Sequence, residues 1–141
     1  MDIIKVMAPA SKSVSHRAII AASLAAGRCL VHHCLESDDL NVTRGAMRAA
    51  GASIQGVDGI YDISGVAGRP TGGEIEPTGI QMLESGTSCR LLTAVLAAGH
   101  GKFRVHGADR LHERPVDHLA LALEKWGVEF DWEGQEGYPP M

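Results

Sequence analysis

The sequence predicts an α/β fold built from two copies of a βαβαββ unit. Three landmarks recur in the same order, and the offset between their copies grows only from 72 to 76 residues. They are a helix end that reads Leu-Ala-Ala-Gly at 24–27 and 96–99, a Val-His pair at 31–32 and 105–106, and a glycine-stopped helix at 47–52 and 123–128. Matched order and spacing indicate an internal duplication. Each copy is therefore expected to contain a buried helix, a strand, an amphipathic helix and a strand pair.

The chain is expected to begin with a short strand at 3–7, which Pro9 ends. A helix follows at 14–26, and Gly27 is its natural C-terminal stop. The residues expected on its inner face are Val14, Ala18, Ala21, Ala22 and Ala25. Because this helix is apolar nearly all round, we expect it to be central in the fold.

A strand at 29–32 leads to a second helix, which Ser37 should cap and which ends at Ala50 before Gly51. Asp38 and Asp39 in its first turn suit the positive end of the helix dipole. Its expected inner face is Leu40, Thr43, Met47 and Ala50, and its other face should be exposed. Further short strands are expected at 52–54, 60–63 and 80–83, separated by glycine-rich turns.

Composition excludes several classes of protein. The chain has 141 residues with a formal net charge of −4, which argues against a nucleic-acid or anionic-membrane surface. Cys29, Cys34 and Cys89 lack CxxC spacing, so we expect no disulfide framework or zinc site, and the predicted location is the reducing cytoplasm. The histidines form no HxxxH or HExxH motif, so no metal is expected. No segment reaches the roughly 18 apolar residues of a membrane helix.

A first candidate anion site lies across the start of the first helix. Free backbone N–H groups and the positive end of the dipole meet there. Lys12 adds a point charge, Ser13 and Ser15 add hydroxyl donors, and Arg17 adds a planar fork. The structural alternative is that the serines only cap the helix and the cations lie on its solvated face. Two cations at the unfavourable end of a helix need a partner, which favours the anion site.

The equivalent helix of the second copy begins with a similar set of residues. Gly86 permits close approach of the backbone, Thr87 is a small polar residue, and Arg90 lies within the first turns. Capping with a structural arginine explains this segment equally well. In the charged loop that follows, we expect Arg110 to reach a ligand. Arg114 is expected to form a structural ion pair with Glu113 and to pair in addition with Asp38 or Asp39.

These motifs resemble those of the enolpyruvyl transferases. Residues 8–17 resemble the family's proline-glycine-serine-lysine-serine signature and its following arginine. Residues 37–39, 85–90 and 110–115 resemble its acidic helix start, second signature and arginine-rich third signature, and 137–140 also has a counterpart. The resemblance implies two lobes of three βαβαββ units each. Residues 12–84 and 85–141 would then be two units of an N-terminal lobe, and we expect a truncated chain that lacks the third unit and the second lobe.

The resemblance also implies a reaction of the shikimate pathway. The enolpyruvyl group of phosphoenolpyruvate is transferred to the 5-hydroxyl of shikimate 3-phosphate, and phosphate is released. No metal or organic cofactor is implied. By the same resemblance, Lys12 touches both substrates as the catalytic group, Ser13 and Arg17 hold shikimate 3-phosphate, and Gly86 and Arg110 contact phosphoenolpyruvate. Additional candidates are Thr87, Arg90 and Asp39. The proton-transfer groups would lie on the missing lobe, so this chain alone is expected to be inactive.

Four residues depart from the family pattern: Ala10 replaces glycine, His16 asparagine, Cys89 methionine and Glu84 asparagine. A carboxylate at Glu84 would repel phosphoenolpyruvate unless it turns away or pairs with a cation. Two alternatives remain open. One is the branch of the family that uses UDP-N-acetylglucosamine, although Ser13 after Lys12, followed by Arg17, favours shikimate 3-phosphate. The other is a non-catalytic anion-binding module on the same fold.

Overall fold

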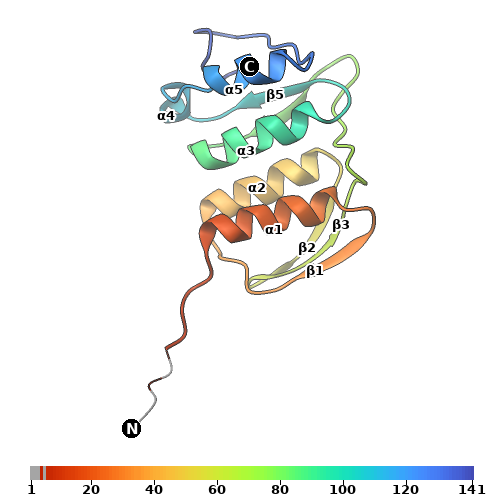
Figure 1. Cartoon of the computed structure of the whole chain (residues 1–141), viewed down its shortest axis with the longest axis vertical. Helices are drawn as coiled ribbons and strands as arrows, with labels where there is room; N and C mark the ends of the chain where they lie inside the picture. Colours follow the sequence, from red (N-terminus) through yellow and green to blue (C-terminus); the bar gives the residue numbers. More distant parts are fainter. Residues whose placement is uncertain (1–3, 5) are drawn as a thin grey trace.

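The computed structural model describes Ile4 and residues 6–141 and has the mixed α/β fold that the sequence predicts. The elements are α1 (Lys12–Leu24), β1 (Arg28–Val31), α2 (Asp38–Ala49), β2 (Ser53–Val57), β3 (Ile60–Ser64), β4 (Thr78–Gln81), α3 (Gly86–Ala97), β5 (Phe103–His106), α4 (Asp109–His112) and α5 (Asp117–Glu124). In Figure 1, α1 and α2 cover one face of the β1–β3–β2 sheet, and α3 separates α2 from β5 and α5. None of the helices in the described residues is long and apolar enough to span a membrane.

The first sheet is antiparallel, with strand order β1-β3-β2. Its β2–β3 hairpin turns at Asp58-Gly59. φ is positive at both residues (54° and 75°), as in the two-residue hairpin turns whose twist matches that of the strands. Ile54 and Ile63 are cross-strand partners and are 4% and 0% exposed. Side chains alternate along a strand, so this register gives the sheet one buried face, against which α1 packs.

The second sheet pairs β4 and β5 in parallel, with Ile80 opposite Val105. Parallel strands need a crossover connection, and α3 supplies it. The segments that leave the two strands, one entering α3 and the other entering α4, therefore start at the same edge of the sheet. Val105 also exchanges backbone hydrogen bonds with Met141 at 2.8 and 3.1 Å.

The second helix, α2, occupies the centre of the molecule and packs against α1, α3 and β4. Its predicted inner face is confirmed, because Leu40, Thr43, Met47 and Ala50 are all 0% exposed. The starts of α1, α2 and α3 all lie at the same side of the molecule, the left side in Figure 1. The three parallel helices thus present their N-terminal ends together.

The expectation that α1 is the central helix and α2 the peripheral one is wrong. Val14 is 57% exposed and Ala21 is also exposed, whereas Ile19 and Ile20 are buried. Small residues on all sides of a helix give it no unique apolar stripe, so the two bulky isoleucines decide which face turns inward. For α3 and α5, the corresponding helices of the second predicted unit, the expectation holds, because α3 buries a full face while α5 buries only Ala120.

One predicted strand and one predicted strand pair do not form in the described residues. Ile4, Val6 and Met7 are exposed and in no strand, while residues 3 and 5 lie outside the described residues. The strand pair expected after Gly127 is also absent, since 128–141 contains no strand. Pro139 and Pro140 have no N–H to donate to a ladder. Phe130 and Trp132 stack on each other instead, with ring centroids 5.5 Å apart, and pack against the core.

Candidate anion site at the starts of three helices

Each of the three clustered helices begins with a serine that caps it. Ser11 Oγ accepts from Val14 N–H at 3.4 Å, Ser37 Oγ accepts from Leu40 N–H at 3.4 Å, and Ser85 Oγ accepts from Ser88 N–H at 3.2 Å. The capping part of the structural alternative is therefore correct. Capping leaves other first-turn amides available, and the positive ends of three helix dipoles still converge, which favours an anion at this side of the molecule.

An ion pair joins the first two helices. The Lys12 ammonium donates to the Asp39 carboxylate, so one of the cations at the start of α1 has an acidic partner from α2. The hydrogen bond from Lys12 is the main reason that the pKa of Asp39 lies below its usual value, and the nearby Ser85 hydroxyl acts in the same direction. The Lys12 side chain remains 49% exposed. Solvent and ligands can thus reach its ammonium group.

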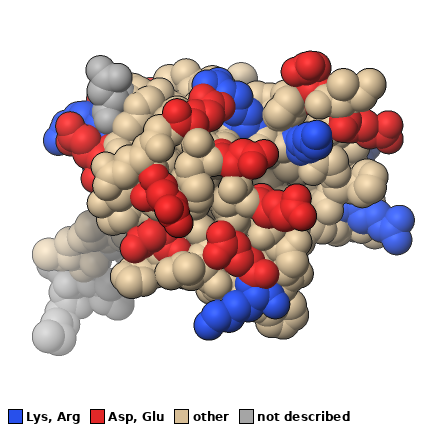
Figure 2. Space-filling model, turned by 90° about the horizontal axis from the view of Figure 1, so that it is seen from above, with Lys and Arg blue, Asp and Glu red and all other residues tan. Residues whose placement is uncertain are grey.

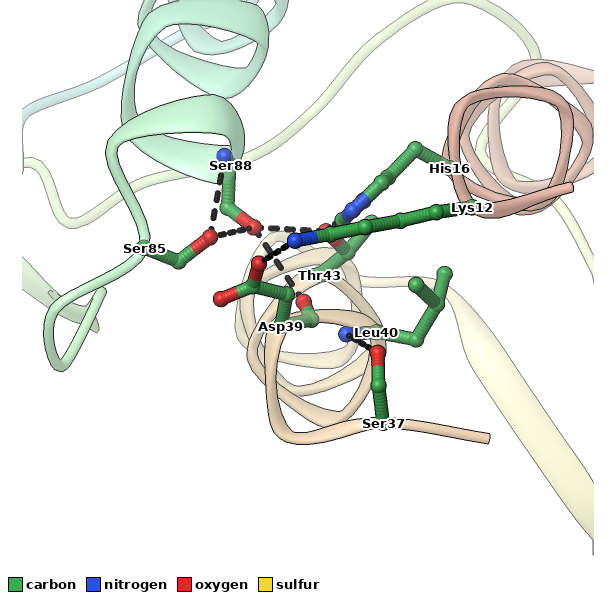
Figure 3. Close-up of polar contacts among 8 residues, drawn as sticks. All are labelled: Lys12, His16, Ser37, Asp39, Leu40, Thr43, Ser85 and Ser88. Atoms are coloured by element: carbon green, nitrogen blue, oxygen red, sulfur yellow. Dashed lines mark hydrogen bonds and ion pairs between the residues drawn. The ribbon is translucent and has the colours of Figure 1, made fainter. Parts of the chain in front are cut away.

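A chain of polar side chains behind this ion pair connects all three helices (Figure 3). His16 Nδ1 of α1 lies 2.8 Å from Thr43 Oγ1 of α2, and Thr43 Oγ1 lies 3.0 Å from Ser88 Oγ of α3. Ser88 Oγ lies 2.8 Å from Ser85 Oγ and donates to the Asp39 carbonyl at 3.2 Å. His16, Thr43 and Ser88 are each 0% exposed. The starts of α1 and α3, each predicted as an anion site, are therefore parts of one connected structure.

Gly86 opens α3 and lies beneath the side chain of Arg114. A methyl group added at Gly86 would lie 2.6 Å from Nη1 of Arg114 and 3.1 Å from its Cδ. These residues meet because each follows the carboxyl end of one of the two parallel strands. The expected ion pair of Arg114 with Glu113, Asp38 or Asp39 is absent from the described residues. Arg114 thus joins the start of α3 in the position expected for Arg110.

The remaining predicted site residues are exposed. Ser13 and Arg17 lie on the outer surface of α1, Thr87 and Arg90 on that of α3, and Arg110 in α4. Among the described residues, no ion pair or side-chain hydrogen bond connects Ser13, Arg17 or Arg110 to the Lys12–Asp39 pair. Ser15 is not available to a ligand. Its hydroxyl is buried, donates to the Ser11 carbonyl at 2.9 Å and accepts from Leu35 N–H at 2.9 Å.

Glu84 is exposed and has no cationic partner among the described residues. Its carbonyl accepts from Gly86 N–H at 3.0 Å, and Ser88 N–H is donated to Ser85. Of the first three amides of α3 in the described chain, only that of Thr87 is left for a ligand. The start of α3 consequently depends on Arg114, in addition to its backbone, to attract an anion.

Sequence reasoning missed Thr43, Ser88 and Arg114, and it treated His16 only as a departure from a family pattern. A signal was present. His16 lies one turn after Lys12, Thr43 one turn after Asp39, and Ser88 nearly one turn after Ser85, so each charged or capping residue has a polar residue behind it on the same face. A polar residue that recurs about one turn inside each helix start indicates hydrogen bonds between the helices.

Charge is distributed unevenly over the surface. Figure 2 shows the face above α5 and the C-terminal segment, where acidic side chains dominate. Between 113 and 136 the basic residues are Arg114 and Lys125, against Asp or Glu at 113, 117, 124, 129, 131, 133 and 136. That face repels anions. In the part of the chain that the structure describes, no three His, Cys, Asp or Glu residues gather in a way that could hold a metal ion.

Comparisons with known proteins all point to one family. Residues 4–141 match the model of the family described as EPSP synthase (3-phosphoshikimate 1-carboxyvinyltransferase). Enzymes named 3-phosphoshikimate 1-carboxyvinyltransferase from Bordetella petrii and Bordetella pertussis are 38% and 41% identical over 138 residues, which is 97% of this chain. An EPSP synthase structure from Acinetobacter baumannii matches 94% of the chain with 35% identity and a TM-score of 0.83.

The chain is short by comparison with all of these relatives. It spans 30% of the length of the two Bordetella enzymes and 30% of the Acinetobacter chain. The matched region nevertheless contains every motif described above, from the start of α1 to the segment that follows α5. The chain belongs to the EPSP synthase (3-phosphoshikimate 1-carboxyvinyltransferase) family.

Proposed function

We propose that this chain forms part of the substrate site of an enolpyruvyl transferase. The reaction adds the 5-hydroxyl of shikimate 3-phosphate to phosphoenolpyruvate and then releases inorganic phosphate from the tetrahedral adduct. The substrates are assigned through the family, whose name specifies 3-phosphoshikimate and carboxyvinyl transfer. The chain would supply anion-binding groups. The rest of the active site would come from the part of the longer relatives that this chain does not cover.

The observation that carries the proposal is the contact between Lys12 and Asp39, together with the hydrogen bond from Ser88 of α3 to the Asp39 carbonyl. Through these two contacts the starts of α1 and α3 are both attached to the first turn of α2. Phosphoenolpyruvate and shikimate 3-phosphate both carry phosphate, and they must approach each other for the new bond to form. Two neighbouring cationic helix starts would reduce their mutual repulsion and orient them.

Individual roles follow from position. Lys12 lies between the two helix starts and is proposed as the catalytic group that touches both substrates. Ser13 and Arg17, which are exposed on α1, are proposed to hold shikimate 3-phosphate. Gly86 and Arg114 are proposed to hold phosphoenolpyruvate, with Thr87 and Arg90 next to them on α3. Arg110 is exposed in α4 and is proposed only as a peripheral contact.

The proposed location is the cytoplasm, where aromatic amino acid precursors can be made in reducing conditions. Cys29, Cys34 and Cys89 are all free thiols. Three unpaired cysteines are typical of a reducing compartment. Burial raises the pKa of Cys34 and of Cys89 above the ordinary thiol value, so neither forms a reactive thiolate at neutral pH.

The test is calorimetric titration of the chain with shikimate 3-phosphate and, separately, with phosphoenolpyruvate. We expect one site for each, weakened about tenfold by Lys12→Ala, since a charge-assisted hydrogen bond is lost. Lys125→Ala is the matched control, because Lys125 is exposed at the end of α5, away from the helix starts. Tighter binding of UDP-N-acetylglucosamine than of shikimate 3-phosphate would contradict the proposed substrate. Binding of phosphoenolpyruvate, phosphate and sulfate with equal affinity would indicate a non-catalytic anion module instead.

A further inference from the structure

His16 is a buried titratable residue for which the proposed substrate contacts give no role. Its side chain is 0% exposed, and it lies one turn behind Lys12 on α1. Nδ1 contacts the Thr43 hydroxyl at 2.8 Å, while Nε2 is buried with no hydrogen-bond partner among the described residues. A buried polar ring with one engaged and one free nitrogen needs an explanation.

The direction of the hydrogen bonds that follow from His16 is inferred from the contacts of Ser88. A carbonyl oxygen cannot donate, so in the contact of 3.2 Å the Ser88 hydroxyl donates its single proton to the Asp39 carbonyl. Ser88 Oγ must then accept in both of its other contacts, from Ser85 at 2.8 Å and from Thr43 at 3.0 Å, which makes Thr43 a donor. The Thr43 proton is thereby used, so Thr43 must accept from His16. The proton of a neutral His16 is consequently on Nδ1.

The free nitrogen leads to the same tautomer. If the proton were on Nε2, a buried N–H donor would lack a partner, and an orphaned donor is strongly unfavourable. A lone pair on Nε2 leaves only an unused acceptor. Burial also lowers the pKa of His16, with Lys12 acting in the same direction and Asp39 against it, so the ring stays neutral. The neutral ring with Nδ1–H therefore satisfies the contact with Thr43 and leaves no buried donor of the ring unpaired among the described residues.

We propose that His16 is a positioning residue, which acts through Thr43 and Ser88 to fix the first turn of α3 relative to α1. The chain of bonds runs from His16 to Thr43, from Thr43 to Ser88, and from Ser88 to the Asp39 backbone. It ends on the residue whose side chain holds Lys12. Lys12 and the start of α3 are thus held in a fixed mutual position by a path that no ligand touches.

The consequence for ligands rests on the proposed function, whereas the tautomer and the order of the first turn of α3 do not. Ser88 is the third residue of α3, and its position determines where Gly86 and the Thr87 amide lie. If this turn shifts, phosphoenolpyruvate bound there is displaced relative to Lys12. Loss of the His16 contact should therefore weaken the binding of phosphoenolpyruvate more than the binding of shikimate 3-phosphate.

The first experiment reads the tautomer directly in the unmodified chain. Long-range proton–nitrogen correlation spectra of the histidine rings at pH 7.5 distinguish a protonated nitrogen from an unprotonated one. We expect His16 with Nδ1 protonated and Nε2 unprotonated. A proton on Nε2, or an imidazolium ring at this pH, would reverse the inferred direction of the chain and overturn the proposal.

The second experiment measures amide hydrogen exchange in variants of the chain. His16→Leu removes the donor and Thr43→Val breaks the link to Ser88, so both should speed exchange of the Ser88 and Cys89 amides about fivefold. His16→Asn is the rescue variant, because its side-chain amide can place an N–H near the position of Nδ1. Its exchange should stay close to that of the wild type. The amide of Ile63 in β3 is the internal control and should not change.

Each outcome decides between the alternatives. Unchanged exchange at Ser88 in both His16→Leu and Thr43→Val, or equal acceleration in His16→Asn and His16→Leu, would contradict the positioning role. Phosphoenolpyruvate titration then adds the functional readout, with about fivefold weaker binding in His16→Leu and none of this loss in His16→Asn. If the wild-type chain binds neither substrate, the proposed function fails while the tautomer and exchange results still test His16. If a variant does not fold, the wild-type tautomer decides.

Discussion

The carboxylate of Asp39 holds the ammonium of Lys12 although 27 residues separate them in the sequence. Lys12 begins α1 and Asp39 lies in the first turn of α2, so the pair fixes how two helix starts approach each other. The side chains are 49% and 29% exposed, and an ion pair this accessible contributes little to stability. Its main effect is electrostatic, because Asp39 partly neutralises the cation that would attract an anion.

Asp39→Asn should therefore tighten the binding of inorganic phosphate while changing the stability of the fold by less than about 1 kcal/mol. The negative charge beside the anion is removed, and the amide oxygen can still accept from Lys12. Calorimetric titration with phosphate and thermal unfolding measure the two effects. Asp62→Asn is the matched control, because Asp62 also pairs with a cation, Arg28, but on the exposed face of the sheet. Weaker phosphate binding in Asp39→Asn would show that the pair organises Lys12 rather than neutralising it.

The same pair should give a small acid-sensitive term in stability. Lys12 lowers the pKa of Asp39 below its usual value of 3.8, so the folded state favours the ionised carboxylate. This contribution is complete above pH 3.8 and is lost as the pH falls through the lower pKa of the folded state. The stability difference between wild type and Asp39→Asn, measured by urea unfolding, should accordingly shrink between pH 5 and pH 2. A difference that grows on acidification would contradict the direction of the shift.

Gly86→Ala should weaken phosphoenolpyruvate binding without unfolding the protein. The added methyl group would lie 2.6 Å from Nη1 of Arg114, and the flexible arginine can move away, which removes it from the ligand. Gly45→Ala is the matched control, since Gly45 lies in α2 with nothing within 4 Å of an added methyl group. Replacing a helical glycine by alanine stabilises by up to about 1 kcal/mol, so Gly45→Ala should unfold at a higher temperature with unchanged binding. Unchanged binding in both variants would remove Gly86 and Arg114 from the site.

Much of the fold could be predicted from the sequence because local signals and tertiary contacts agree there. Ser37 caps α2 and its inner face is fully buried, as the apolar spacing indicates. The turn at Asp58-Gly59 supports the hairpin in the same way. The inner face of α1 could not be predicted, because alanine is compatible with either face and only packing against the sheet and α2 decides. The strand pair predicted after Gly127 does not form. The repeated sequence pattern predicts it, but Pro139 and Pro140 have no N–H group to donate to a ladder.

The candidate site could be predicted only in part, and the reason differs from that for the fold. Lys12 and Gly86 could be placed at helix starts from local sequence alone, since capping and glycine signals are local. Whether Arg110 or Arg114 reaches Gly86 depends on how the loop leaves β5, which no local pattern specifies. The path from His16 to Ser88 joins three helices, and it depends on their packing rather than on any spacing within one of them.

Arg114→Ala should weaken phosphoenolpyruvate binding about tenfold, and Arg110→Ala should change it much less, because only Arg114 lies over Gly86. Both arginines are exposed and neither forms an ion pair among the described residues, so both variants should fold and the two serve as controls for each other. Neither variant should change the affinity for shikimate 3-phosphate. Titration with that substrate therefore distinguishes the two arginines from the α1 residues that are proposed to bind it. A larger effect from Arg110→Ala would restore the prediction made from the sequence.

His16 should make stability depend on pH near neutrality. Burial lowers its pKa below the usual 6.5, with Lys12 adding to this effect and Asp39 opposing it, so the folded state resists protonation while the unfolded state does not. The contribution is therefore complete above pH 6.5 and is lost as the pH falls below it, because the unfolded chain then binds more protons. His16→Asn, which cannot titrate, should lose less stability than the wild type in urea unfolding between pH 7.5 and pH 5. His106 also has a lowered pKa, and the variant His106→Asn measures its contribution to the pH dependence of stability. Equal pH profiles for wild type and His16→Asn would show that His106 alone carries the effect.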